Sequence, residues 1–221
     1  MIDRSVGRVM PSLATEIPPR EKILDAAEEL FARRGFAGVG LSEIAEAVTL
    51  GKSTLFHHFR SKAQLYAAVV ERILGEIEKR VTRALAAGGS PSERLDRWMD
   101  TIIDLLGERP SYSRLLLRSL FEDDELSGAL EEERQANETL ARVLEGIGNL
   151  LREGMASGEL RAASIPHTLQ TLIGIVIYHF ASGDFGAELL RRPLFSPADV
   201  KRRKQEVKAF LHHGLLVQRN D

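Results

Sequence analysis

Apolar residues recur along almost the whole chain at steps of three and four residues, the spacing at which side chains share one face of an α-helix. The first such stretch follows Pro18-Pro19 and stops before Gly35, which are typical start and stop signals for a helix. Sustained alternation of apolar and polar residues, the pattern of a half-buried strand, is absent from the sequence. The pattern therefore predicts an all-α fold.

Helix-start signals recur further along the chain. Ser61 to Gln64 has the spacing of a capping box, and Ser90 to Glu93 combines a capping serine, a proline at the first helical position and an acid two residues later. Ser196, Pro197 and Asp199 repeat that arrangement. After two short segments at Leu41–Val48 and Lys52–Phe59, the predicted helices run from Ser61 past Ile77, then over about Ser90–Gly107, Ser111–Phe121, Leu126–Ser157, Pro166–Ala181 and Pro197–Val217.

The two short segments carry the most informative pattern. Helices over Leu41–Val48 and Lys52–Phe59, joined by the turn Thr49-Leu50-Gly51, match a helix-turn-helix, in which the second helix enters the DNA major groove. Leu55 and Phe59 of the second helix are expected to pack inward. The candidate DNA-binding residues are Gly40, Ser42, Gly51, Lys52, Ser53, Thr54, Phe56, His57, His58 and Lys62.

The side chains of this segment suit a duplex. Lysines neutralise phosphates, and the hydroxyls of Ser53 and Thr54 can hydrogen-bond phosphates or base edges. Between Val48 and Lys62 the sequence has three cations, Lys52, Arg60 and Lys62, and no acid. This segment is therefore locally basic.

Composition narrows the class of protein. The 221 residues include 30 Lys+Arg, 32 Asp+Glu and no Cys, and 43% are hydrophobic. These values exclude disulfide scaffolds, cysteine-ligated zinc and a disordered chain. The net charge of -2 argues against a protein that coats nucleic acid indiscriminately, but it leaves room for a small basic patch masked by acids elsewhere. The longest apolar stretch, Leu172–Phe180, is too short to span a bilayer, and no signal-peptide pattern is present, so we expect a cytoplasmic protein without a membrane partner.

The sequence resembles the TetR family of bacterial transcriptional regulators. The resemblance covers about Arg20 to Val70, and a weaker echo lies at Glu153–Arg161. The positions that carry it are Ile23–Ala27, Leu30-Phe31, Gly35-Phe36, Leu41, Ile44-Ala45, Thr54–Phe59, Ser61-Lys62 and Leu65. It implies an N-terminal three-helix bundle with the helix-turn-helix, joined to a larger C-terminal helical body for ligand binding and dimerisation.

This resemblance leads to the expected function, a ligand-responsive repressor. As a homodimer it would bind a palindromic double-stranded DNA operator, and a small-molecule effector would release it. We expect a flexible N-terminal arm at residues 1–17, the DNA-binding domain at 18–62 and the body at 63–221, with no cofactor and no enzymatic activity. The alternative is an all-helical small-molecule-binding protein or enzyme whose DNA-binding unit is vestigial.

The chain departs from the usual family pattern at four positions. Gly40 and Gly51 stand where hydroxyl residues usually cap the two helices, Thr49 stands where the turn usually has glycine, and Phe56 stands where tyrosine is common. Glycine costs a helix cap only a few tenths of a kcal/mol. These departures predict fewer contacts to the DNA backbone, or compensation by Arg4 and Arg8 of the N-terminal arm.

Candidates in the body rest on large apolar residues with a few polar handles. The expected ligand-binding residues are Trp98, Met99, Ile102, Arg118, Phe121, Leu144, Thr171, Ile175 and Tyr178. The expected dimer interface comprises Leu169, Gly174, Ile177, Val207, Phe210, Leu211 and Leu215, on two helices that are apolar on much of their surface. In both cases the alternative is that these residues simply form the core of one protomer.

Three other patterns resemble functional motifs but are better explained in other ways. Gly51-Lys52-Ser53-Thr54 resembles the end of a P-loop, but Glu46 stands where that motif needs glycine. Adjacent His57 and His58 point in different directions on a helix and lack a carboxylate one turn away, so a metal site is not expected. The basic run Lys201–Lys204 is interpreted as a solvated face or as ion pairing across a dimer.

Overall fold

The computed structural model describes residues 18–120 and 130–217, and its regular secondary structure is entirely α-helical. The all-α prediction is therefore confirmed. No helix in these two ranges is both long and apolar enough to cross a membrane. The predicted arm at 1–17, with Arg4 and Arg8, and the candidate Phe121 lie outside the described residues.

The helices are α1 (Pro19–Arg34), α2 (Leu41–Ala47), α3 (Lys52–His58), α4 (Lys62–Ala86), α5 (Pro91–Glu108), α6 (Pro110–Ser119), α7 (Glu131–Ala156), α8 (Ile165–Ala181), α9 (Gly183–Leu190) and α10 (Pro197–Gly214).

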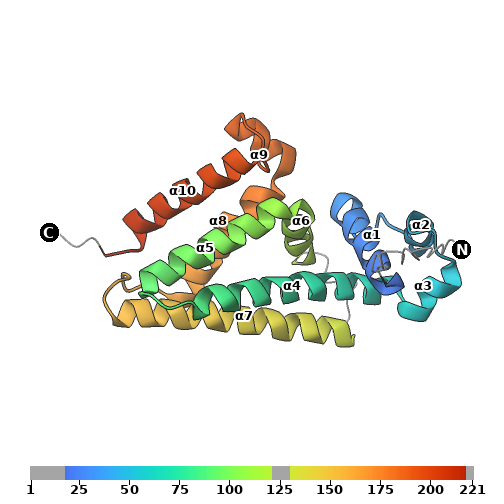
Figure 1. Cartoon of the computed structure of the whole chain (residues 1–221), viewed down its shortest axis with the longest axis horizontal. Coiled ribbons are helices and arrows are strands. Elements are labelled where there is room, and N and C mark those ends of the chain that lie inside the picture. Colours follow the sequence, from blue (N-terminus) through green and yellow to red (C-terminus); the bar gives the residue numbers. More distant parts are fainter. Residues whose placement is uncertain (1–17, 121–129, 218–221) are drawn as a thin grey trace, which may run out of the picture.

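Helices α1 to α3 form a small unit at one end of the molecule (Figure 1). Helix α1 starts with Pro19 at its first position and ends at Gly35, whose φ of 73° lies in the left-handed region that glycine tolerates. The rings of Phe31 and Phe36 both pack edge-on against Tyr66 of α4, with centroids 5.2 and 5.3 Å away. Aromatic packing thus fixes this unit to the start of α4.

Helix α4 is the element shared by both parts of the protein (Figure 1). The Ser61 hydroxyl accepts a hydrogen bond from the Gln64 backbone N–H at 3.0 Å, as the capping pattern predicts. The Gln64 side chain accepts from the backbone N–H of Arg60 instead of that of Ser61. A complete capping box is present at α5, where Ser90 and Glu93 each accept from the other's backbone N–H.

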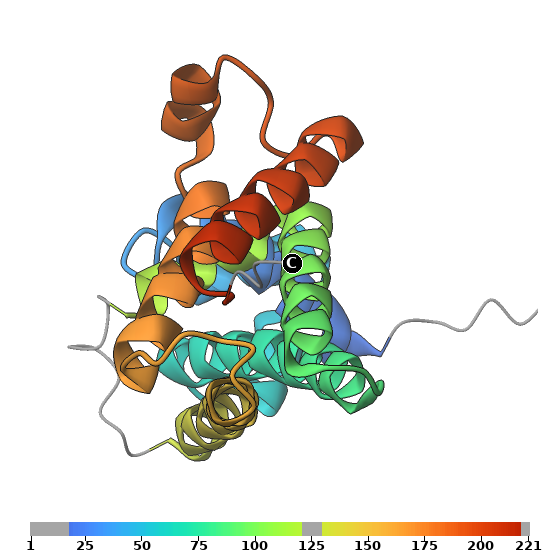
Figure 2. The same cartoon turned by 90° about the vertical axis from the view of Figure 1, so that its left-hand side faces the viewer.

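In the body α4 runs alongside α7, and α5, α6 and α8 complete the core (Figures 1 and 2). Helix α10 lies against α5, and three ion pairs spaced one turn apart join the two helices. They are Lys204–Asp104 at 2.7 Å, Lys208–Asp100 at 2.5 Å and His212–Asp96 at 2.9 Å, the last charged only when the histidine is protonated. Lys204 therefore pairs within the protomer, so the interpretation of Lys201–Lys204 as a uniformly solvated face or dimer contact is wrong for this residue.

Two sequence-based predictions in the C-terminal part need correction. Helix α9 was not predicted, because Gly183 and Gly186 interrupt its apolar pattern. Helix α10 ends at Gly214 instead of Val217, because the last residues leave the helix and pair with the segment after α7. Arg161 N–H donates to Leu215 O at 2.8 Å, and Val217 N–H donates to Glu159 O at 2.9 Å.

Candidate nucleic-acid interface and ligand cavity

The α2–α3 pair has the helix-turn-helix arrangement that its sequence predicts. Ile44 and Ala45 of α2 are buried, as are Leu55 of α3 and Phe59 directly after it. Leu50 is half-buried in the turn. The apolar face of α3 is thus held inward, which fixes the orientation of its other face.

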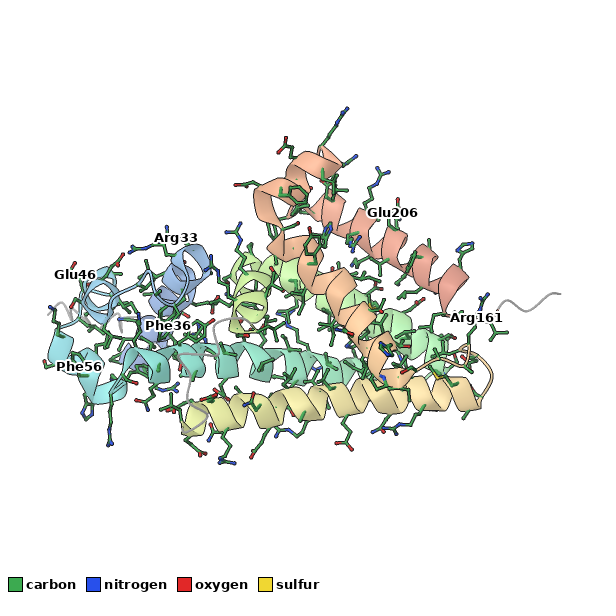
Figure 3. All side chains as sticks on the ribbon, turned by 180° about the vertical axis from the view of Figure 1, so that it is seen from behind. Arg33, Phe36, Glu46, Phe56, Arg161 and Glu206 are labelled. Carbon is green, nitrogen blue, oxygen red and sulfur yellow. The ribbon has the colours of Figure 1, made fainter. Side chains whose placement is uncertain are left out.

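That other face of α3 points away from the protein. Lys52, Ser53 and His57 are exposed, and Phe56 is 49% exposed at the outer end of the molecule (Figure 3). Lys52 makes no hydrogen bond or ion pair with another described residue, so its charge faces solvent. The other candidates on this unit are exposed Gly40, Ser42 and Gly51, and half-buried Thr54 and His58.

Neither short helix has a side-chain cap. Gly40 precedes α2 and Gly51 precedes α3, both with extended backbone, and no side chain accepts a hydrogen bond from either helix start. Thr49 lies between them with φ of 54°, a left-handed conformation unfavourable for a β-branched residue. The departures from the family pattern therefore have structural consequences at the turn itself.

Lys62 is placed differently from the other cations of this segment. Its ammonium donates a hydrogen bond to the Phe36 carbonyl at 3.0 Å and lies 4.2 Å from the centroid of the Phe36 ring. Lys62 is half-buried. The structure thus gives this residue an intramolecular role, whereas the sequence suggested a free phosphate contact.

Sequence reasoning missed Arg20, which lies on the same surface. Its guanidinium carbon lies 5.4 Å from the centroid of the Phe59 ring, next to α3, and the same group pairs with half-buried Glu21 at 3.3 Å. Arg20 precedes the apolar pattern of α1 and is separated from α3 by about thirty residues in sequence. Only the packing of α1 against α3 places it there.

A network of ions and hydroxyls links α1 with α4 and α6. Arg72 of α4 pairs with Asp25 at 2.7 Å and with Glu28 at 2.6 Å on α1. Glu28 is buried, and its carboxylate also accepts a hydrogen bond from Ser111 Oγ of α6 at 2.6 Å. Burial opposes the charge of Arg72, but the two carboxylates prevail and raise its pKa. The DNA-binding unit is therefore joined to the body through charged contacts as well as the aromatic ones.

A second polar contact lies beside this network. The Tyr112 hydroxyl of α6 donates to Glu76 of α4 at 2.6 Å, and Arg80 pairs with the same carboxylate at 2.9 Å. Burial is the main cause that raises the pKa of Tyr112, and the hydrogen bond to Glu76 raises it further. The phenol therefore stays protonated. Burial works against ionisation of Glu76, yet the bonds from Tyr112 and Arg80 lower its pKa. Helices α4 and α6 are thus fixed to each other near the DNA-binding unit.

The body contains an apolar cavity of about 90 Å³ among α4, α5, α6, α7 and α8. Every described residue that lines it is hydrophobic. The lining consists of Leu74, Ile77, Trp98, Ile102, Leu106, Leu116, Leu140, Val143, Leu144, Ile147, Leu172, Ile173, Val176 and Ile177.

Of the predicted ligand residues that the structure describes, three line this cavity, namely Trp98, Ile102 and Leu144. Met99 is fully buried but points elsewhere in the core, and Arg118 is absent from the lining. Thr171 and Tyr178 are exposed, and Ile175 lines a groove beside α10, because these three residues lie on the outer faces of α8. For this cavity, the predictions for Met99, Arg118, Thr171, Ile175 and Tyr178 are therefore corrected. The other lining residues were missed because their sequence pattern equals that of ordinary core.

The candidate dimer residues divide into four groups. Val207 and Leu211 are buried within the protomer, which corrects their assignment to an interface, and Ile177 lines the cavity. Leu169 and Leu215 are half-buried. Gly174 and Phe210 are exposed, and Phe210 borders a groove between α8 and α10.

The exposed helix-turn-helix and the helical body together define a DNA-binding regulator. The sequence profile described as "Bacterial regulatory proteins, tetR family" matches residues 23–69. The chain is 30% identical over 145 residues to the HTH-type transcriptional repressor NemR of Escherichia coli K12, covering 65% of this chain and 70% of that protein. The chain therefore belongs to the TetR family of bacterial transcriptional regulators, as its motifs indicated.

Solved structures share the complete fold. The ketosteroid transcriptional regulator KstR2 of Mycobacterium tuberculosis superposes with a TM-score of 0.73 at 15% identity, covering 93% of this chain and 100% of that one. AibR, solved in complex with isovaleryl coenzyme A and operator DNA, superposes with a TM-score of 0.70 at 20% identity, covering 86% and 96%. These structures confirm the predicted fold, and membership of the family confirms the prediction of a DNA-binding transcriptional regulator.

Proposed function

We propose that this regulator represses transcription as a cytoplasmic homodimer that holds a palindromic operator through α3 and releases it when a small molecule occupies the cavity. The observation that carries the proposal is the outward face of α3, where Lys52, Ser53 and His57 stand exposed without a neighbouring acid on their helix. Residues 18–62 are the DNA-binding domain and the residues after them are the ligand and dimer body. We assign no catalytic role to either.

The residues of the DNA-binding unit make different kinds of contact with DNA, according to the chemistry of their side chains. Lys52 supplies charge to a phosphate, while Ser42 and Ser53 supply hydroxyls to the DNA backbone or base edges. Thr54, Phe56, His57 and His58 lie on the helix that enters the groove. Two copies related by a two-fold axis would read half-sites about 34–36 Å apart, one turn of DNA, or a small multiple of that distance.

Ligand release would act through the helices that the two sites share. Leu74 and Ile77 of α4 and Leu116 of α6 line the cavity, and both helices also contact the DNA-binding unit. A ligand that prefers a wider cavity favours a different placement of α4 and α6. The contacts of Arg72 and Ser111 with Glu28 would transmit this change to α1.

A fluorescence-anisotropy titration of a random duplex at several salt concentrations tests DNA binding. Lys52→Ala should weaken binding to every sequence and reduce the slope of log K against log [salt] by about 1, because one phosphate contact is lost. Lys79→Ala is the matched control, since Lys79 is an exposed lysine of the body. Absence of binding at low salt would favour the alternative of a helical binding protein with a vestigial DNA unit. Equal effects of the two substitutions would remove Lys52 from the interface.

A further inference from the structure

Among the described residues that line the cavity, none can compensate a charge. All fourteen lining residues are aliphatic apart from Trp98, and neither an acidic nor a basic side chain is among them. An ionised ligand group placed there would lose its hydration without gaining a partner. The wall therefore favours uncharged, mainly hydrocarbon molecules over carboxylates, ammonium ions and phosphates.

One residue of this wall, Trp98, carries a polar atom with unused hydrogen-bonding capacity. The indole Nε1 of Trp98 is buried and donates to no acceptor among the described residues. Buried N–H groups in folded proteins nearly always have an acceptor, and a buried tryptophan N–H usually finds one. Since Trp98 lines the cavity, a ligand oxygen that reaches its Nε1 as the surrounding helices separate can supply the missing acceptor.

We infer that the effector is a neutral hydrocarbon-rich molecule with one hydrogen-bond acceptor, a ketone, ester or ether, whose oxygen accepts from Trp98 Nε1. This inference rests on the proposed function for the location of the effector site, and it adds the chemical class and the polar anchor.

The volume of the cavity adds a condition on ligand size. At about 90 Å³ it is smaller than an engineered apolar cavity of about 150 Å³ that admits benzene. A ligand with one ring and a side group therefore has to separate the surrounding helices. Because protein interiors are close-packed, this separation moves α4 and α6 instead of being absorbed locally.

Three probes of one shape separate charge from hydrogen bonding: cyclohexyl methyl ketone, isopropenylcyclohexane and cyclohexanecarboxylate. Trp98 is the single tryptophan of the chain, so its fluorescence reports occupation of the cavity in the full-length protein without DNA. The ketone should give a saturable change, the alkene should bind about tenfold more weakly, and the carboxylate about a hundredfold more weakly. Equal binding of ketone and alkene would overturn the Trp98 hydrogen bond, and tighter binding of the carboxylate would overturn the neutral class.

Two further measurements connect the result to this cavity. In Trp98→Phe, followed by calorimetry, the ketone should lose its advantage over the alkene. Ile173→Phe narrows the cavity and should abolish binding of both neutral probes, whereas Ile175→Phe, two residues along the same helix and outside the lining, should leave it unchanged. Identical effects of these two substitutions would overturn the location.

The outcomes also separate this inference from the proposed function. If the carboxylate or an acyl-coenzyme A binds and releases DNA while the ketone does not bind, the regulator is ligand-responsive and the inferred class is wrong. If the ketone binds at Trp98 but DNA affinity stays the same, the chemical class stands and release by this cavity fails.

Discussion

At the scale of single residues, Thr49 carries strain in the helix-turn-helix. Its φ of 54° is readily accessible to glycine but costs a residue with a Cβ roughly 1 kcal/mol. We therefore expect Thr49→Gly to raise the free energy of unfolding by about 1 kcal/mol in urea titrations. Thr49→Ala keeps the Cβ and serves as the control. An equal gain in the alanine variant would show that the β-branch, and not the left-handed backbone, is the source of strain.

Lys62 offers a second test at this scale, because its ammonium bonds the Phe36 carbonyl and lies over the Phe36 ring. Lys62→Met keeps most of the apolar stem and removes the charge. We expect unfolding to become easier by about 1 kcal/mol, the usual size of such contacts, while the salt dependence of DNA binding keeps its slope. A slope reduced by about 1 without loss of stability would instead assign Lys62 to a phosphate.

At the scale of helices, the contact between α6 and α1 is one polar connection between a helix that lines the cavity and the DNA-binding unit. Leu116 of α6 lines the cavity, and Ser111 of the same helix donates to buried Glu28 of α1. We expect Ser111→Ala to leave DNA affinity in the absence of ligand nearly unchanged and to reduce the ligand-induced loss of affinity by about 1 kcal/mol.

The measurement is anisotropy of labelled operator DNA with and without cyclohexyl methyl ketone. Ser119→Ala is the control, because the Ser119 hydroxyl bonds only the Leu116 carbonyl of its own helix among the described contacts. Unaltered coupling in Ser111→Ala would show that the signal travels through α4 alone.

Among the helices, the sequence predicted where several of them begin, but it did not predict which of their faces border the cavity. Helix starts at Ser61, Ser90 and Ser196 depend on residues three apart and were predictable from local chemistry. The face of a buried helix that borders a cavity is set by its neighbours, and hence Ile173 and Ile175 look alike in sequence but lie in different places. Val207 was likewise assigned to a dimer because its apolar stripe fits a partner subunit as well as α5 of its own protomer.

At the scale of the whole molecule, the net charge of -2 is an average over regions of different charge. The acid-free segment from Val48 to Lys62 lies at one end, whereas Glu206 lies on α10 far from it (Figure 3). The ion pairs between α5 and α10 use Lys204, from the basic run Lys201–Lys204, and Lys208, which follows it, inside the protomer. A small basic surface on a near-neutral protein suits binding to one DNA site in preference to general adhesion.

Dimerisation is the remaining requirement of the proposed function, and we expect its interface on the outer faces of α8 and α10. Tyr178 of α8 is 58% exposed, and Phe210 of α10 is 64% exposed and lines a groove with Ile175 of α8 and Ala209. Large apolar side chains exposed together are typical of interfaces. Phe210→Glu should therefore give a species with the 24.6 kDa mass of one chain in sedimentation experiments. Operator affinity should fall as well, since one protomer reaches one half-site.

Phe56→Glu is the reciprocal control for this experiment, because it makes the same chemical change at an exposed phenylalanine on α3. It should remain a dimer and lose DNA binding through the charge that it places against phosphates. If Phe210→Glu also remains a dimer at all concentrations, the interface lies elsewhere. If instead it is monomeric but binds the operator with unchanged affinity, pairing of half-sites contributes nothing and the homodimer model of operator recognition fails.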